Sequence, residues 1–421
     1  MSEPAPQVVP PADNQQDEAP QGGQRFSVRE IFRSDHPALV TILAIFAAVV
    51  IGSLLIVVSD EPTRAAASYF TAAPMDTLSA AWHAVSGAYV ALFQGSILNP
   101  SSLSSGSLTT ILGPISETIV SATPLILAGL SVTLAFRAGL FNIGAQGQIL
   151  VAAIFAGYVG FSWHLPVVLH VIVAIIAGVV GGAIWAGIAG VLKAKTGAHE
   201  VITTIMLNYV ALGLIQFLLS VHGFQAKPYT QAIATPVDGT ARYPHLLGDS
   251  LRANTSFLIA IAATIGVAWL LRRSTFGFRV RAVGANQDAA RTAGISISRV
   301  YIGVMLLVGA LAGLAGSAQV LGTQPQVTAD IDAGIGFDAI TVALLGRGSA
   351  SGTFWAGMLF GALRAGSVQL LASTSTPADL VQVLQALIVL FIAAPGLVRL
   401  IFRLRATDGG DSAVLAKGWN G

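Results

Sequence analysis

Few side chains in this sequence could carry out chemistry, and no combination of them matches a catalytic motif. The chain has no Gly-x-x-x-x-Gly-Lys-Ser/Thr phosphate loop and no His-Glu-x-x-His zinc motif. The run from Gly348 to Gly352 has alanine where the serine of a nucleophile elbow must stand. The histidines show no ligand spacing, and the absence of cysteine excludes thiolate chemistry. We therefore expect neither ATP hydrolysis nor a metal or other cofactor in this chain.

What remains are amide, aromatic and acidic side chains within or beside long apolar runs. Polar groups are costly inside a bilayer, and they are therefore candidates for function. Amides donate and accept hydrogen bonds, as a sugar or nucleoside requires, and an aromatic face can stack against a base. The residues expected to line a solute pathway are Glu117, Phe141, Asn142, Gln146, Gln148, Asn208 and Asp338.

A structural interpretation competes with the functional one for each of these residues. The amides could form hydrogen bonds between helices and serve only to hold a bundle together. Asp338 and Arg364 lie on neighbouring predicted spans and could pair with each other. The residues alone leave both interpretations open.

The composition indicates that a lipid bilayer surrounds these side chains. Of the 421 residues, 54% are hydrophobic and only 10% are charged, whereas a soluble domain carries roughly a quarter charged residues. A bilayer accommodates this excess because it solvates apolar side chains on the outside of a helical bundle. We expect an all-α, polytopic membrane protein with about ten transmembrane helices, at 38–58, 110–136, 141–161, 166–191, 201–221, 255–271, 299–321, 335–346, 353–371 and 379–397.

The basic residues indicate how these spans are oriented. With the N-terminus in the cytoplasm, Arg364 falls within a span and most of the other 21 basic residues fall inside; those outside are Arg64, Lys227, Arg242 and Arg252. Cytoplasmic loops carry an excess of lysine and arginine. We therefore expect ten crossings with both termini in the cytoplasm.

The remaining segments are two tails, two long loops, an amphipathic stretch and a break between spans. The tails are 1–24 and 406–421, on either side of a membrane domain at 25–405. The long loops are 222–254 outside and 272–298 inside. Residues 75–97 suit a helix at the membrane interface, and the alternative for them is a further span. Arg137 to Gln148 joins two spans with three glycines and three amides, which indicates interrupted backbone.

Four blocks of sequence resemble the permease subunits of ABC importers. They are ATPLILAGLSVTLAFRAGLFNIGAQGQIL within 117–150, HEVITTIMLNYVA at 199–211, TFGFRVRAVGANQDAARTAGI at 275–295 and GIGFDAITVALLGRGSASGTFWAG at 334–357. Together they are similar to the branched-chain amino acid, ribose and nucleoside type, and above all to its nucleoside or simple-sugar branch. The resemblance covers roughly residues 38–400.

The resemblance implies partners and a coupling element. It implies two ATPase subunits on the cytoplasmic face, a substrate-binding protein outside and a second permease, with the NIGAQGQ form favouring a heterodimer. It also implies the bacterial plasma membrane as the location, and no nucleic-acid partner. A short cytoplasmic helix is expected to dock into the ATPase through Asn286, Asp288, Ala289, Ala290, Arg291 and Gly294. The alternative for this loop is an ordinary basic cytoplasmic loop.

Two other classes of protein compete with the importer. An ion-coupled secondary transporter would need buried acidic groups, and only Glu117 and Asp338 offer themselves. An intramembrane enzyme would need one of the absent motifs. The solute itself stays open among nucleosides, free bases and simple sugars.

Overall fold

The computed structural model describes residues 37–104, 106–374 and 379–403. The predicted tails at 1–24 and 406–421 lie outside these ranges. Within them, the chain forms helices and isolated β-bridges but no strand, which confirms the all-α class.

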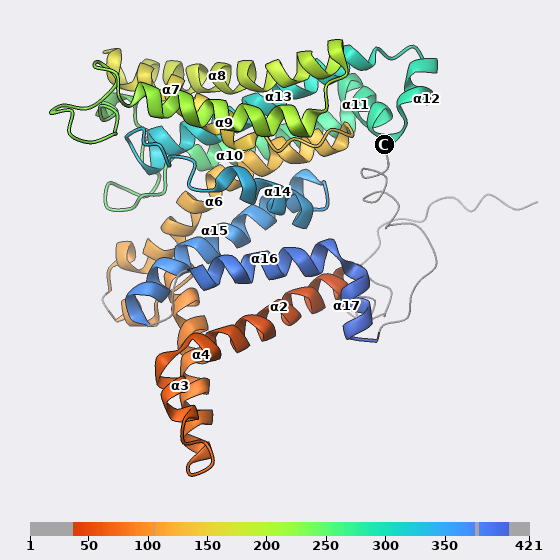
Figure 1. Ribbon diagram of the computed structural model, residues 1–421. Coiled ribbons are helices and arrows are strands. Elements are labelled where there is room, and N and C mark those ends of the chain that lie inside the picture. Colours follow the sequence, from red (N-terminus) through yellow and green to blue (C-terminus); the bar gives the residue numbers. More distant parts are fainter. Residues whose placement is uncertain (1–36, 105, 375–378, 404–421) are drawn as a thin grey trace, which may run out of the picture.

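The N-terminal half begins with a helical hairpin and continues into long helices (Figure 1). Its elements are α2 (Pro37–Ser59), α3 (Glu61–Ala67), α4 (Pro74–Ser96), α5 (Pro100–Leu103), α6 (Leu108–Arg137), α7 (Ala145–Ser162), α8 (Val167–Thr196) and α9 (Glu200–Leu218).

The C-terminal half alternates long helices with short ones. Its elements are η1 (Gly239–Ala241), α10 (Ser256–Arg273), α11 (Thr275–Ala285), α12 (Gln287–Thr292), α13 (Ile297–Ala318), η2 (Gln319–Thr323), α14 (Ile335–Leu345), α15 (Ala350–Ser373), α16 (Asp379–Ala393) and α17 (Pro395–Ile401).

Glycines allow the central helices to pack backbone to backbone. A Cβ on Gly313 of α13 would lie 2.6 Å from the carbonyl oxygen of Gly178 on α8, and one on Gly182 would overlap the carbonyl of Gly309. A Cβ on Gly361 of α15 would likewise come within 2.6 Å of the α6 backbone. Small residues permit this approach where no hydrophobic force drives helices together. These glycines therefore set the closest contacts between α8 and α13 and between α6 and α15.

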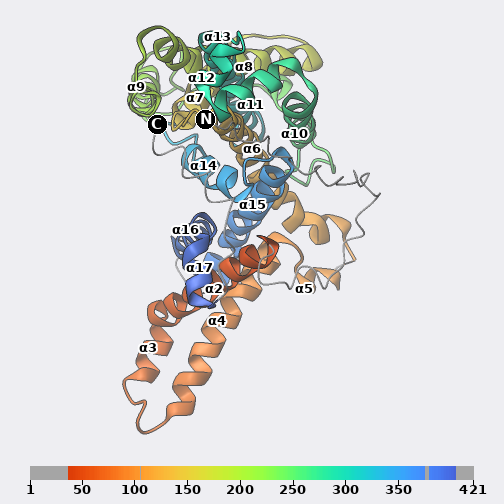
Figure 2. The same cartoon turned by 90° about the vertical axis from the view of Figure 1, so that its right-hand side faces the viewer.

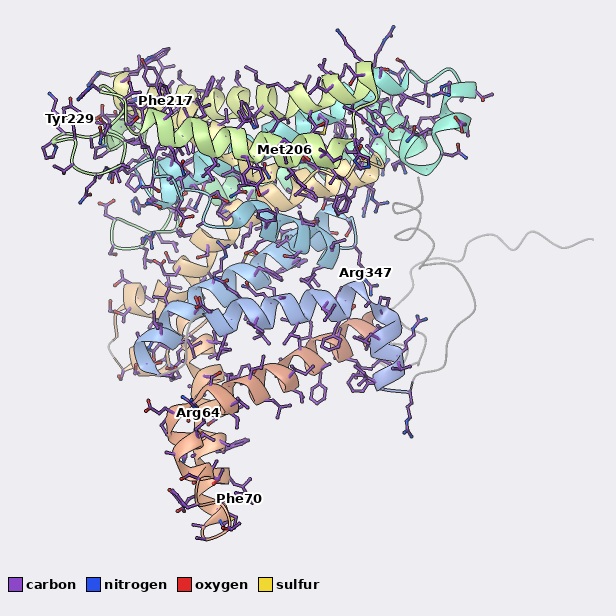
Figure 3. All side chains as sticks on the ribbon, in the orientation of Figure 1. Arg64, Phe70, Met206, Phe217, Tyr229 and Arg347 are labelled. Atoms are coloured by element: carbon purple, nitrogen blue, oxygen red, sulfur yellow. The ribbon has the colours of Figure 1, made fainter. Side chains whose placement is uncertain are left out.

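Burial distinguishes a central helix from peripheral ones. α6 is the most enclosed candidate span: 83% of the residues in its apolar 18-residue stretch are buried, whereas the corresponding share is 22% for α9 and for α10. The exposed face of α9 carries large apolar side chains, including Met206 and Phe217 (Figure 3). An apolar outer surface of this kind is suited to lipid rather than water.

The number of crossings is only partly fixed by the helices. Seven helices of the described ranges are long and apolar enough to span a membrane, and the pair α16–α17 makes an eighth if it is one span. The two other predicted spans correspond to α14, which has only 11 residues, and to α15, which contains Arg364. The count of ten therefore stays a prediction.

The last predicted span, 379–397, does not form one straight helix. α16 ends at Ala393, and α17 leaves it at an angle of 90°. Pro395 explains the bend, because proline lacks an N–H and disfavours the α conformation at the residue before it.

The stretch predicted to lie at the interface forms one helix, α4. In two views the α3–α4 hairpin projects from the bundle, and α4 runs steeply across the axes of α8 and α13 (Figures 1 and 2). Its C-terminal part packs closely on α15, where a Cβ on Gly95 would lie 3.0 Å from the Cα of Gly366. Its N-terminal part exposes Met75, Leu78 and Trp82. This arrangement supports the interfacial interpretation, which stays a prediction.

Candidate functional site

The first break in the bundle separates α6 from α7 at residues 138–144. Gly139 adopts a φ of 72°, in the left-handed region that favours glycine. A Cβ at this position would also lie 3.3 Å from the Cα of Gly284 on α11. The interruption predicted for Arg137 to Gln148 is therefore confirmed.

Two buried amides, Asn142 and Asn208, satisfy backbone groups that this break leaves without helical hydrogen bonds, and a third, Gln148, holds Asn142 in place. Asn142 accepts a hydrogen bond from the Gly144 N–H at 2.9 Å and another from the Gln148 side chain at 3.2 Å. Asn208, on α9, accepts from an N–H in the first turn of α7 and donates to the Ile143 carbonyl, both at 2.9 Å. Because Asn142, Gln148 and Asn208 are at most 6% exposed, their structural interpretation has direct support.

A second break lies between α13 and α14. α13 continues into the π-helical turn η2, and residues 324–334 that follow form no regular helix. Within this break the Gln319 side chain donates to the Ile331 carbonyl at 3.0 Å, and Gly334, with a φ of 76°, precedes α14. π turns inserted in helices are frequent at functional sites, so this break is a candidate site.

The two breaks meet where α7 and α14 begin. A Cβ on Gly336 would lie 2.5 Å from the backbone nitrogen of Gln146, so the first turns of the two helices are in backbone contact. The Gln146 side-chain nitrogen lies 3.5 Å from one carboxylate oxygen of Asp332. Asp332 is only 3% exposed. Asp332 was not among the predicted site residues because it falls between predicted spans, where an ionisable residue is unremarkable.

Asp338 and Arg364 form an ion pair beside this junction. One carboxylate oxygen of Asp338 lies 2.7 Å from an Arg364 guanidinium nitrogen, which also donates to the Ala333 carbonyl at 2.9 Å. Both side chains are about a quarter exposed. The pairing proposed from the sequence is confirmed, and it ties α15 to the start of α14.

Glu117 and Phe141 occupy different surroundings from the amides. Glu117 pairs with Arg252 of the loop 222–254 at 2.9 Å, and Arg252 also donates to the Thr323 carbonyl of η2 at 3.0 Å. The ring of Phe141 stacks on that of Phe136, with centroids 5.2 Å apart. The structure therefore brings the amides and Phe141 together at the first break, whereas Glu117 lies with the loop 222–254.

The loop 222–254 is also fastened to the second break. The Ala234 N–H donates to the Val327 carbonyl and the Val237 N–H to the Pro325 carbonyl, both at 2.9 Å. The Gln326 side chain donates back to the Ala234 carbonyl at 2.8 Å. Displacement of this loop must therefore strain the segment that leads to α14.

The predicted coupling element forms α11 and α12, at the end of the bundle opposite the loop 222–254 (Figure 1). Asn286 caps α12, since its side-chain oxygen accepts from the N–H groups of Asp288 and Ala289 at 2.9 and 3.0 Å. Asp288, Ala289 and Arg291 are exposed, whereas Ala290 is 4% exposed and belongs to the core of this chain. Of these two expected contact residues, Ala289 is accessible on the surface, whereas Ala290 is packed within this chain and is not available for docking.

The end of α11 touches the first break directly. A Cβ on Gly284, at the end of α11, would overlap the Arg137 carbonyl oxygen. The Arg137 side chain in turn donates to the Gly348 carbonyl, in the turn before α15, at 2.6 Å. A movement at the end of α11, from which the chain continues into α12, can therefore reach residues 138–144 through van der Waals contact.

Residues 115–393, about two thirds of the chain, match the family described as "Branched-chain amino acid transport system / permease component". The chain belongs to this family. No solved structure gave a significant match.

Several relatives of this permease carry functional names. The guanosine ABC transporter permease protein of Bacillus subtilis is 37% identical, over 68% of this chain and 83% of its own length. The nucleoside ABC transporter permease protein of Lactococcus lactis is 35% identical, over 72% and 85%. The glucose ABC transporter permease protein of Haloferax volcanii is 39% identical, over 66% and 75%.

These matches confirm the resemblance stated for the four sequence blocks. The chain is a permease subunit of an ABC transporter and carries out transport rather than chemistry. The alternatives of an ion-coupled secondary transporter and of an intramembrane enzyme lose their support.

Proposed function

We propose that this permease forms the membrane channel of an ATP-driven importer of nucleosides. The observation that supports this proposal is the similarity to the guanosine and nucleoside permeases, at 37% and 35% identity. A simple sugar is the second candidate, because the relative with 39% identity is named a glucose permease.

The ATPase would dock on the exposed face of α12. That face is mostly polar and follows a basic region made up of the last turn of α10, with Arg272 and Arg273, and of α11, with Arg279 and Arg281. An enrichment in arginine is expected of the cytoplasmic side. Because the chain has no phosphate loop, hydrolysis would take place in two separate ATPase subunits.

A second, different permease would complete the channel. Each of the three organisms named above also has a second matching permease, at 27%, 26% and 29% identity. Two unequal permeases in one organism support a heterodimer. A substrate-binding protein would deliver solute to the side of the loop 222–254, and the assembly would reside in a bacterial plasma membrane.

The solute would pass by the junction of the two breaks. Irregular backbone at membrane depth is tolerated where it is buried in protein or lines a polar pathway. Among the predicted pathway amides, Gln146 is the one whose side chain does not take part in the hydrogen bonds of the first break; it faces Asp332 instead. Asn142, Gln148 and Asn208 would maintain the shape of this site, and Asp338 would hold Arg364 beside it.

Reconstitution in liposomes tests this function. The permease is co-purified with its ATPase, second permease and binding protein, and uptake of radiolabelled guanosine and glucose is measured with ATP inside the vesicles. We expect saturable uptake of guanosine with ATP and none with a non-hydrolysable analogue, whereas ATP-driven uptake of glucose alone would favour the second candidate. Uptake that follows a proton or sodium gradient without ATP would contradict the proposal.

A further inference from the structure

Asp332 is a buried carboxylate that the contacts of the fold satisfy only in part. One oxygen faces the Gln146 amide, and the carboxylate also faces the Gly334 N–H before α14. The other oxygen is sealed from solvent and has no hydrogen-bond partner in the described part of the chain. Arg364, the cation of this region, is held by Asp338 and by the Ala333 carbonyl.

Burial of a carboxylate in this position costs free energy, and the surrounding fold offsets only part of that cost. A buried charge normally requires a paired cation or several donors. Asp332 lies instead where α7 and α14 both begin, and the N-terminal ends of helices carry partial positive charge. These ends attract negative charge and so offset part of the cost of burial, but one oxygen is left able to accept further hydrogen bonds.

We propose that Asp332, together with Gln146, is a solute-contact site that accepts hydrogen bonds from the O–H or N–H groups of a neutral solute. An ionised carboxylate only accepts hydrogen bonds, and two adjacent donors on a ribose or a base fit its two oxygens. The inference rests on the proposed function and adds to it a residue and a ligand chemistry.

The site is closed in this structure. The contact between Gly336 and the Gln146 backbone seals the junction. Solute therefore reaches Asp332 only when the first turns of α7 and α14 separate, and this step is the opening of the pathway. The transported solute takes the place of the missing donor during that step.

The test replaces Asp332 with asparagine, which keeps the shape and removes the charge. Asp330→Asn is the matched control, because Asp330 is exposed and lies two residues earlier in the same break. Both variants are assembled into the full importer, and ATP-driven uptake of guanosine and glucose is measured per folded permease. Thermal unfolding of each permease is measured in the same preparations.

We expect Asp332→Asn to lower the maximal uptake rate by about tenfold or more, since a hydrogen bond to a charged group is lost. The substrate concentration for half-maximal uptake should change little, because the binding protein sets it. The melting temperature should stay or rise, because an unpaired buried charge has been removed. Asp330→Asn should behave as the wild type.

Three results would overturn the inference. Normal uptake by Asp332→Asn would show that the carboxylate does not contact solute. A lower melting temperature together with low uptake would mean that Asp332 stabilises the start of α14 and does not contact solute. An equal loss of uptake in Asp330→Asn would mean that uptake depends on the negative charge of this segment and not on Asp332 itself. If the wild type imports neither probe, the proposed function falls as well.

Discussion

Asn208 illustrates how the amides of this permease hold an interrupted backbone in place. From α9, its side chain bonds the Ile143 carbonyl within the first break and an N–H in the first turn of α7, which follows the break. Removal of this side chain leaves one N–H and one carbonyl unsatisfied in a buried position. The residue therefore gives a sharp test of the structural interpretation.

We expect Asn208→Ala to lower the free energy of unfolding by about 1–3 kcal/mol, the cost of an unsatisfied buried polar group. Thermal unfolding of the purified permease measures this change. Met206→Ala is the matched control, because Met206 lies on the same helix with 52% of its surface exposed. If Asn208→Ala melts like the wild type but imports more slowly per folded molecule, Asn208 is a pathway residue instead.

The amides at the first break could be found from the sequence, but their partners could not. Asn142, Gln146 and Gln148 stand out because they are polar residues beside glycines in an apolar run. The bond from Asn208 to Ile143 joins residues 65 positions apart and depends on how α9 packs. Asp332 was not predicted as a site residue, because its burial results from the fold of 324–334, which no hydrophobic periodicity predicts.

Among the elements, α12 gives the most direct test of coupling to the ATPase. Ala289→Glu adds a bulky charge to the exposed face of its first turn, where an acidic residue does not disturb the helix itself. We expect co-purification of the ATPase to fall by roughly tenfold, as for a substituted interface residue of central importance. The permease should still reach the membrane.

Gln231→Glu is the control for this experiment, because Gln231 is exposed in the loop at the other end of the bundle. Ala290 and Gly294 are unsuitable probes, although the sequence indicated both. Ala290 is packed inside the chain, and Gly294 has a φ of 80° that a side chain would strain. Full ATPase binding by Ala289→Glu would remove α12 from the interface.

The glycine contact between α8 and α13 yields a prediction about folding. We expect Gly309→Leu to abolish most folded protein, because its side chain would overlap the backbone of Gly182. Gly213→Leu should be tolerated, since a Cβ on Gly213 of α9 meets nothing within 4 Å. Fluorescence-detected size exclusion of the two variants measures the difference, and equal yields would contradict the packing of these helices.

For the whole molecule, the predicted orientation in the membrane can be tested at the two ends of the bundle. The chain contains no cysteine, so single cysteines can be placed at exposed positions without a background. We expect Gln231→Cys to react with an impermeant maleimide in intact cells, and Asp288→Cys to react only after permeabilisation. Labelling of Asp288→Cys from outside would reverse the predicted orientation.

At this scale the sequence predicted the class and most long helices, but not their continuity. Length and hydropathy placed spans near α2, α6 and α8, because long apolar runs have one stable state in a bilayer. The bend before Pro395 and the π turn at 319–323 were not predicted. Both arise where local backbone geometry, rather than composition, decides the path of the chain.

The fastening of the loop 222–254 to residues 325–327 has a thermodynamic consequence. A protein that binds this loop acts on residues 325–327, which lie in the segment that leads to Gly336. A protein that binds α12 acts through Gly284 on the segment that leads to Gln146. The two proteins therefore act on opposite sides of the contact between Gly336 and Gln146. If both ligands prefer the same state of that contact, their binding free energies are linked. By reciprocity, the factor by which the ATPase changes affinity at the loop equals the factor by which the loop's ligand changes affinity for the ATPase.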